Sequence, residues 1–191
     1  AFSLTEKNAG SDAAGIETVA EYDPAKRVYR ISGRKQWTTN GSLAKILTVM
    51  AKTDGKVTAF IVTPEMKGFS VLDRALEKVG MRRSTTSNLL FEQVEVPEEN
   101  ILGPKGGGLK VCLTVLDYGR TTFGATCTGA AREAVHLATE HAMSRYQFKR
   151  PLASFELVKK KLAEMHAKLY AMESTTLLTA GLLDSGVEDI M

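Results

Sequence analysis

The sequence predicts an α+β protein, in which an all-β barrel or sandwich domain is followed by a long antiparallel helical hairpin that is part of a helical bundle. Residues 2–96 contain short runs of β-type residues separated by turn residues, without a helical period. Beyond the glycine cluster 106–108, apolar residues recur at the i, i+3, i+4, i+7 spacing of a helix face. We therefore place the β-domain at 1–103 and the helical part at 104–191.

Six segments have the length and composition of β-strands. Turn dipeptides such as Asn40-Gly41 and Asp54-Gly55 separate them. The predicted strands are 15–22, 28–37, 46–51, 57–62, 69–72 and 89–96. Strands that follow each other this closely favour a barrel or a sandwich.

Two helices are predicted after the glycine cluster. The first covers about 108–143, and Pro151 lies in the segment that breaks it. Ser154 has the side chain of an N-cap for the next helix, whose apolar seam consists of Val158, Leu162, Met165, Leu169 and Met172. Because two helices alone leave such a seam partly exposed to solvent, we expect further helices from a continuation of the chain or from other subunits.

The composition excludes several classes of protein. With 43% hydrophobic and 25% charged residues, the chain is expected to be soluble and globular. A net charge of +3 is too balanced for a nucleic-acid footprint, and no apolar stretch is long enough to be transmembrane. Cys112 and Cys127 are isolated, and the three histidines lack partners at ligand spacing, so we expect neither a disulfide framework nor a metal site.

Four motifs in a fixed order carry a resemblance to a known family. They are LTEKNAGSD at 4–12, GRKQWTTNG at 33–41, VGMRRSTT at 79–86 leading into 90–103, and Gly119-Arg120 followed by SRYQF at 144–148. Together they resemble the acyl-CoA dehydrogenase family over essentially the whole chain. Details such as 42–49 and 56–60 are most similar to its very-long-chain branch.

The resemblance implies α,β-dehydrogenation of an acyl-CoA thioester, with FAD bound noncovalently as the acceptor. It also implies a homo-dimer or tetramer that passes electrons to an electron-transfer flavoprotein. Such a protein must position the flavin, polarise the thioester carbonyl and exclude water. Two alternatives are an acyl-CoA oxidase-like enzyme, in which oxygen reoxidises the flavin, and a homologue that acts as a respiratory-complex assembly factor.

The resemblance assigns the flavin surface to two of the motifs. Trp37 offers a flat surface to the isoalloxazine, and Thr39, two residues on, would point to the same side of a strand and bond the N5 edge. Thr5 would contact the pyrimidine side. The remaining members of this surface are Phe2, Leu4 and Thr38. From the residues alone, a core tryptophan beside a turn is an alternative for Trp37.

Phosphate groups of the cofactor are assigned to two other places. Gly10 and Ser11 would let a phosphate approach main-chain N–H groups, unless they form an ordinary turn. Arg145 matches an arginine that reaches the flavin pyrophosphate of a neighbouring subunit, and Gln147 and Phe148 follow it in the same motif. Lys149 replaces the glycine that the family usually has next, so the form of this turn is open.

The acyl-CoA site is assigned to Ser11, Asp117 and Arg120. The alternative for the last two is a local helix ion pair at i and i+3. No catalytic residue is assigned, because Gly119 stands where one branch of the family carries its glutamate base. In the other branches that base lies beyond Met191. We therefore expect 1–191 to be an internal fragment without dehydrogenase activity of its own.

Overall fold

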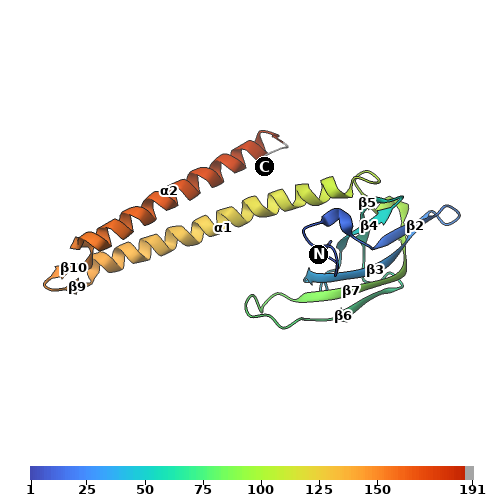
Figure 1. Cartoon of the computed structure of the whole chain (residues 1–191), viewed down its shortest axis with the longest axis horizontal. Coiled ribbons are helices and arrows are strands. Elements are labelled where there is room, and N and C mark those ends of the chain that lie inside the picture. Colours follow the sequence, from blue (N-terminus) through green and yellow to red (C-terminus); the bar gives the residue numbers. More distant parts are fainter. Residues whose placement is uncertain (188–191) are drawn as a thin grey trace. The chain divides into compact units, whose positions relative to one another are not determined.

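A computed structural model describes residues 1–187 and shows the α+β architecture that the sequence predicts (Figure 1). The chain divides into two compact units, 1–114 and 115–191. Helix α1, Gly108–Ser144, begins in the first unit and continues into the second. Each unit is described by itself below.

The first unit is built on an eight-stranded sheet with the order β6-β7-β3-β2-β4-β5-β8, in which β1 also pairs with β4. Its pairs are antiparallel except β1 with β4 and β2 with β4, which are parallel. All six predicted strands are present. The strands are β1 Phe2–Ser3, β2 Val19–Asp23, β3 Val28–Thr39, β4 Leu47–Thr53, β5 Lys56–Val62, β6 Phe69–Asp73, β7 Thr86–Pro97 and β8 Ile101–Leu102. Two short 3-10 turns, Ala13–Gly15 and Glu98–Asn100, precede β2 and β8.

The sheet folds over a single apolar core. The rings of Tyr29 on β3 and Phe60 on β5 lie 5.1 Å apart between centroids, although β2 and β4 separate these strands in the sheet. Only a sheet that curls around its inner face brings such strands together. The core side chains are Ala20, Tyr29, Ile31, Leu47, Val49, Ala51, Phe60, Val62, Leu89, Phe91, Val94 and Val96. Each large apolar side chain that is fully buried here contributes about 1.5–3 kcal/mol.

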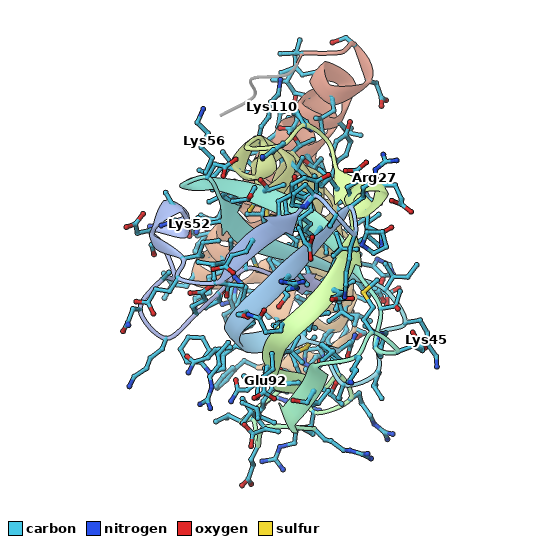
Figure 2. The ribbon with its side chains drawn as sticks, turned by 90° about the vertical axis from the view of Figure 1, so that its right-hand side faces the viewer. Arg27, Lys45, Lys52, Lys56, Glu92 and Lys110 are labelled. Carbon is cyan, nitrogen blue, oxygen red and sulfur yellow. The ribbon has the colours of Figure 1, made fainter. Side chains whose placement is uncertain are left out.

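Most charged side chains of this unit lie on its outside. Figure 2 shows the side chains of Lys45, Lys52 and Glu92 projecting away from the sheet. Tight turns join neighbouring strands: the β4–β5 hairpin closes through Asp54 and Gly55, with φ of 50° and 74°. Two positive φ values in a two-residue loop define the turn whose twist matches antiparallel strands.

The glycine cluster is explained by the way α1 begins against β5. A Cβ atom on Gly108 would lie 2.7 Å from the carbonyl carbon of Thr58 and 2.8 Å from the backbone nitrogen of Ala59. Because no real side chain tolerates such contacts, only glycine lets the helix start this close to the strand. One turn on, Cys112 is also buried.

The second unit is an antiparallel pair of helices. Helix α2, Glu156–Asp184, follows α1 after the short strands β9, Tyr146–Gln147, and β10, Arg150–Pro151. Arg132 on α1 forms an ion pair with Glu173 on α2 at 2.7 Å. Thr128 lies earlier on α1 than Arg132, and its hydroxyl is 3.1 Å from that of Thr176, which lies later on α2 than Glu173. The partners therefore run in opposite directions. The predicted seam of α2 is half-buried along its length.

The prediction that Ser154 caps α2 is wrong. Phe155 occupies the N-cap position, and no side chain there caps the helix. After Pro151, residues 152–154 form a 3-10 turn, so that the Ser154 hydroxyl bonds back to the Pro151 carbonyl at 2.7 Å. A serine whose hydroxyl satisfies a preceding carbonyl is not available to the amides that follow it.

Candidate functional site

Trp37 lies on a bulge of β3. Between the pairs Lys35–Leu89 and Thr38–Ser87, residues Gln36 and Trp37 oppose a single residue of β7, Asn88. Trp37 has a φ of 57°, and its backbone N–H donates to the Asn88 side-chain oxygen at 3.2 Å. Its side chain is 63% exposed. The tryptophan is thus turned outward and does not belong to the core of the first unit.

The two threonines after Trp37 face opposite ways. Thr38 is buried, and its hydroxyl lies 3.0 Å from that of Ser3 on β1. Thr39 is exposed, like Trp37. The side chain of Thr38 therefore ties β3 to β1, and its carbonyl accepts the Gly41 N–H at 3.1 Å, whereas Thr39 has a side chain open to a ligand.

Thr5 is joined directly to the bulge. The backbone N–H of Gln36 donates to the Thr5 carbonyl at 2.8 Å. Upstream, the pairing of β1 with β4 fixes Phe2 opposite Thr48, and both Phe2 and Leu4 are half-buried. The structure thereby places Thr5 next to the strand segment that carries Trp37 and Thr39.

A buried ion pair lies beneath this contact. The Lys35 ammonium is 2.7 Å from the Glu6 carboxylate, with side chains 0% and 5% exposed. The same ammonium donates to the Leu4 carbonyl at 2.9 Å. The Glu6 carboxylate also accepts the backbone N–H of Thr18 at 3.1 Å and that of Glu17. The pair connects three segments of backbone.

Burial and ion pairing shift the pKa of Glu6 in opposite directions, and the same is true of the pKa of Lys35. Burial alone would raise the pKa of Glu6, but its hydrogen bonds, with that from Lys35 foremost, bring the pKa below its ordinary value. Burial lowers the pKa of Lys35, and the bond and charge of Glu6 oppose that shift. The carboxylate is held in its ionised form.

Sequence reasoning missed this ion pair, because lysine and glutamate are expected at the surface. A signal was present in β3: Lys35 has the same parity as Tyr29 and Ile31, whose side chains point into the core. Side chains two residues apart share a face of a strand. A charged residue in phase with core residues indicates a buried partner.

Gly10 and Ser11 follow a tight turn anchored by Glu6. The Glu6 N–H donates to the Ala9 carbonyl at 2.9 Å, and the Ala9 N–H donates back at 3.3 Å. Both Gly10 and Ser11 are exposed, and a Cβ on Gly10 would meet nothing within 4 Å. Their main chain is open to an anion.

The predicted phosphate-contacting residues of the second unit lie at the tip between its helices. Arg145, Gln147 and Phe148 are all exposed. Phe148 and Lys149 form a two-residue hairpin loop with φ of 51° and 64°. Lys149 therefore adopts the left-handed conformation that glycine would adopt more readily, and the turn is kept without the glycine.

Asp117 and Arg120 form the i, i+3 ion pair that was the alternative to a ligand contact, at 3.1 Å. They also line a cleft of about 250 Å³ between α1 and α2, together with Thr121, Gly124, Thr175, Thr176, Thr179 and Leu183. Gly119 between them is exposed, and a Cβ there would meet nothing within 4 Å.

Two negative findings concern residues 1–187. Within that range, no cluster of three or more His, Cys, Asp or Glu side chains has the arrangement of a metal site. No helix in the described part of the chain combines the length and the apolarity needed to cross a membrane.

Two models of one protein family match the chain. The acyl-CoA dehydrogenase middle domain matches residues 1–94, and the acyl-CoA dehydrogenase C-terminal domain matches residues 106–191.

Individual proteins show the same likeness. A probable acyl-CoA dehydrogenase of Bacillus subtilis (strain 168) is 39% identical over 98% of this chain and 32% of its own length. The mitochondrial very long-chain specific acyl-CoA dehydrogenase of Homo sapiens is 37% identical over 99% of this chain and 30% of its own length. A crystal structure of an acyl-CoA dehydrogenase complexed with FAD from Bacillus anthracis superposes with a TM-score of 0.84 at 40% identity, over 96% of this chain and 32% of that one. The chain spans about a third of the length of these relatives.

Proposed function

The chain belongs to the acyl-CoA dehydrogenase family, a family of oxidoreductases, and from that premise we propose that it is the flavin-holding segment of an FAD-dependent acyl-CoA dehydrogenase. The proposed reaction is the α,β-dehydrogenation of an acyl-CoA thioester. FAD, when bound, supplies the acceptor for the hydride that leaves the β-carbon. The proposal also includes a homo-oligomer and an electron-transfer flavoprotein that accepts the electrons.

The observation that carries the proposal is the exposed, left-handed Trp37 beside Thr5. A large residue with a positive φ is a costly backbone outlier, by about 1–3 kcal/mol, and such outliers concentrate at ligand sites. Here the outlier turns the indole to the surface of the bulge that Thr5 adjoins. A flat apolar side chain with hydroxyl groups close by suits an isoalloxazine ring, which has a polar edge.

Other residues would hold the rest of FAD. Thr38 and Thr39 would contact the ring together with Thr5, and Phe2 and Leu4 would support them. The open turn at Gly10 and Ser11 would take a phosphate through its amides. At the hairpin tip, Arg145 would reach the pyrophosphate of the cofactor in a neighbouring subunit, with Gln147 and Phe148 beside it.

The acyl-CoA substrate would contact Ser11, Asp117 and Arg120. The aspartate and the arginine would have to exchange part of their mutual bond for the substrate, which costs little because an exposed pair of this kind contributes about 0.3–0.5 kcal/mol. Gly119 has no group that can take a proton, so the proposed proton abstraction requires a carboxylate from elsewhere in the complete enzyme. We assign no base among the described residues.

Replacement of Trp37 tests the proposal in the complete protein that contains this chain. Trp37→Ala is expected to weaken FAD binding by at least about tenfold, measured from the flavin absorbance retained after dialysis. Tyr22→Ala, which removes another exposed aromatic of the same sheet, is the matched control and should leave FAD bound. Anaerobic addition of acyl-CoA thioesters of different chain lengths should bleach the flavin band of the unaltered protein.

The proposal fails if the unaltered protein retains no FAD, or if FAD is retained and no acyl-CoA bleaches it. Electron-transfer flavoprotein should be reduced faster than peroxide is formed. If peroxide were formed faster, the activity would be that of an acyl-CoA oxidase and not of a dehydrogenase.

A further inference from the structure

We infer that Lys35 and Glu6 are positioning residues, whose buried ion pair holds Thr5 in register with the Trp37 bulge so that both present one surface to the flavin. This inference rests on the proposed function, because the flavin is the ligand of that surface. It assigns a role to two residues that would not themselves touch the cofactor.

The Lys35 ammonium bonds the residues that precede and follow Thr5 in the sequence. The Lys35 ammonium bonds the carbonyl of the preceding residue, Leu4, at 2.9 Å and the side chain of the following residue, Glu6, at 2.7 Å. The third bond, from the Gln36 N–H to the Thr5 carbonyl, comes from the residue next to Lys35. Residues 4–6 are therefore held, one after another, by residues 35 and 36.

The same strand segment continues directly into the bulge. The last regular pair of β3 before the bulge joins Lys35 to Leu89 on β7. Trp37 follows two residues later. A displacement of the ammonium would move the main chain of Thr5 and the start of the bulge with respect to each other. Glu6 in turn bonds the backbone of Thr18, so the carboxylate cannot follow such a displacement.

Stability alone is a weak reason for this pair. Removing two charges from water costs several kcal/mol for each ion, and replacing a buried pair by uncharged residues of similar volume is often neutral or stabilising. What an apolar pair does not supply is a set of directed bonds to the Leu4 carbonyl and the Thr18 amide. The pair contributes geometry where the flavin is proposed to lie.

The decisive variant removes both charges and keeps the volume. Glu6→Gln with Lys35→Met leaves an amide oxygen for the Thr18 N–H, but no donor for the Leu4 carbonyl. The control, Lys26→Met with Glu95→Gln, removes a pair of the same length, 2.7 Å, that is exposed on the sheet surface. The complete enzyme is measured with FAD and after its removal.

Three quantities are compared: the thermal midpoint, the Kd for FAD, and hydrogen exchange of the Gln36 amide in the FAD-free protein. For the double variant we expect a midpoint of the FAD-free protein that falls by less than in Glu6→Gln alone, a Kd raised by about tenfold or more, and a Gln36 amide that exchanges about tenfold faster, while the amides of β4 and β5 keep their protection. The control variant should match the unaltered protein in all three.

A double variant that binds FAD normally and protects Gln36 normally would overturn the inference. If the double variant does not fold, Glu6→Asp takes its place: it keeps both charges, shortens the carboxylate by one methylene, and should change the Kd and the Gln36 exchange in the same directions by smaller factors. Unchanged values in Glu6→Asp would count equally against the inference. An unaltered protein that binds no FAD overturns the proposed function and this inference with it, and that failure is distinct because it precedes any substitution.

Discussion

Several residues of this chain have a large side chain and a left-handed backbone conformation. Trp37 carries it at the sheet bulge, and Phe148 and Lys149 carry it at the tip of the helical unit. Each such residue costs of the order of 1 kcal/mol or more, which the surrounding structure has to offset. At Trp37 the bond to Asn88 helps to hold the conformation, and at the tip the short strands β9 and β10 and the contact of the Phe148 ring with Phe155 do so.

Lys149→Gly is expected to stabilise the hairpin tip. Glycine adopts a φ of 64° without the steric cost that lysine bears, so the gain should be about 0.5–1 kcal/mol. Slower hydrogen exchange of the Leu152 amide, which bonds the Arg145 carbonyl across the tip, would report it. Lys168→Gly in the middle of α2 is the control, and it should destabilise the helix by about 1 kcal/mol.

Glu6→Gln alone should destabilise the first unit by about 3–5 kcal/mol, because it leaves the buried Lys35 ammonium without its counter-charge. Denaturant unfolding at pH 7 measures this cost. The variant will also raise the fraction of neutral Lys35, since loss of the carboxylate removes the interaction that opposes the lowering of its pKa. A variant as stable as the unaltered protein would contradict the prediction.

The same pair predicts an acid-dependent loss of stability. The pKa of Glu6 in the folded protein is below its ordinary value of 4.5, so its contribution is complete above pH 4.5 and is lost as pH falls through the folded pKa. The lowered pKa of Lys35 acts on the alkaline side and does not enter this window. The free energy of unfolding of the unaltered protein should therefore drop more steeply below pH 4.5 than that of Glu6→Gln.

At the scale of elements, α1 contains glycines of opposite kinds. Gly108 is pressed against β5, whereas Gly119 and Gly129 meet no atom within 4 Å of an added Cβ. Gly119→Ala should therefore stabilise the protein by about 1 kcal/mol through helix propensity. Gly108→Ala in the same helix should destabilise it by about 1–3 kcal/mol, because the added methyl group overlaps the strand. Thermal unfolding of the two variants checks the opposite signs, and equal signs would refute the assignment.

The regular elements were predictable because their patterns are local. Strand alternation and the change to a helical period located six strands and both helices. The two-residue strand β1 and the bulges at Trp37 and Gln93 were not predicted, since they depend on partners far along the chain, Thr48, Asn88 and Ser32. Positive φ at Trp37 and Gln93 carries no local sequence signal, unlike that at Asp54, which the Asp54-Gly55 turn dipeptide indicates.

At the scale of the whole molecule, the helical unit leaves large apolar side chains uncovered. Phe123, Tyr170 and Leu177 are 68%, 75% and 73% exposed. Soluble monomers rarely expose such residues in extended patches. The sequence predicted this need for cover from the α2 seam, but periodicity cannot identify what provides it.

We expect the 191-residue chain on its own to associate as its concentration rises, which sedimentation velocity would detect. Leu177→Lys should shift the distribution toward the monomer, whereas Thr126→Lys, which adds the same charge at an exposed polar position of α1, should shift it less. A chain that stays monomeric at every concentration would show that the exposed side chains are not adhesive.

The candidate site was predictable only in part. Trp37, Thr39 and Thr5 were found from their motifs, and the structure joins Thr5 to the Trp37 bulge through one hydrogen bond. The assignment of contacts at Arg145 or Asp117 remains a prediction, because those residues belong to the other unit. The pair beneath the site was missed because pairing over 29 positions is a property of the fold.

The Lys35–Glu6 pair also has a consequence for how this protein can evolve. Because loss of either partner strands the other charge in the interior, each single replacement is selected against, even where the double replacement would be harmless. Lineages should then keep both residues or exchange both, with intermediates that are short-lived. If a homologue keeps the lysine, has an aliphatic residue in place of Glu6 and still folds normally, it must contain another group that compensates the lysine charge.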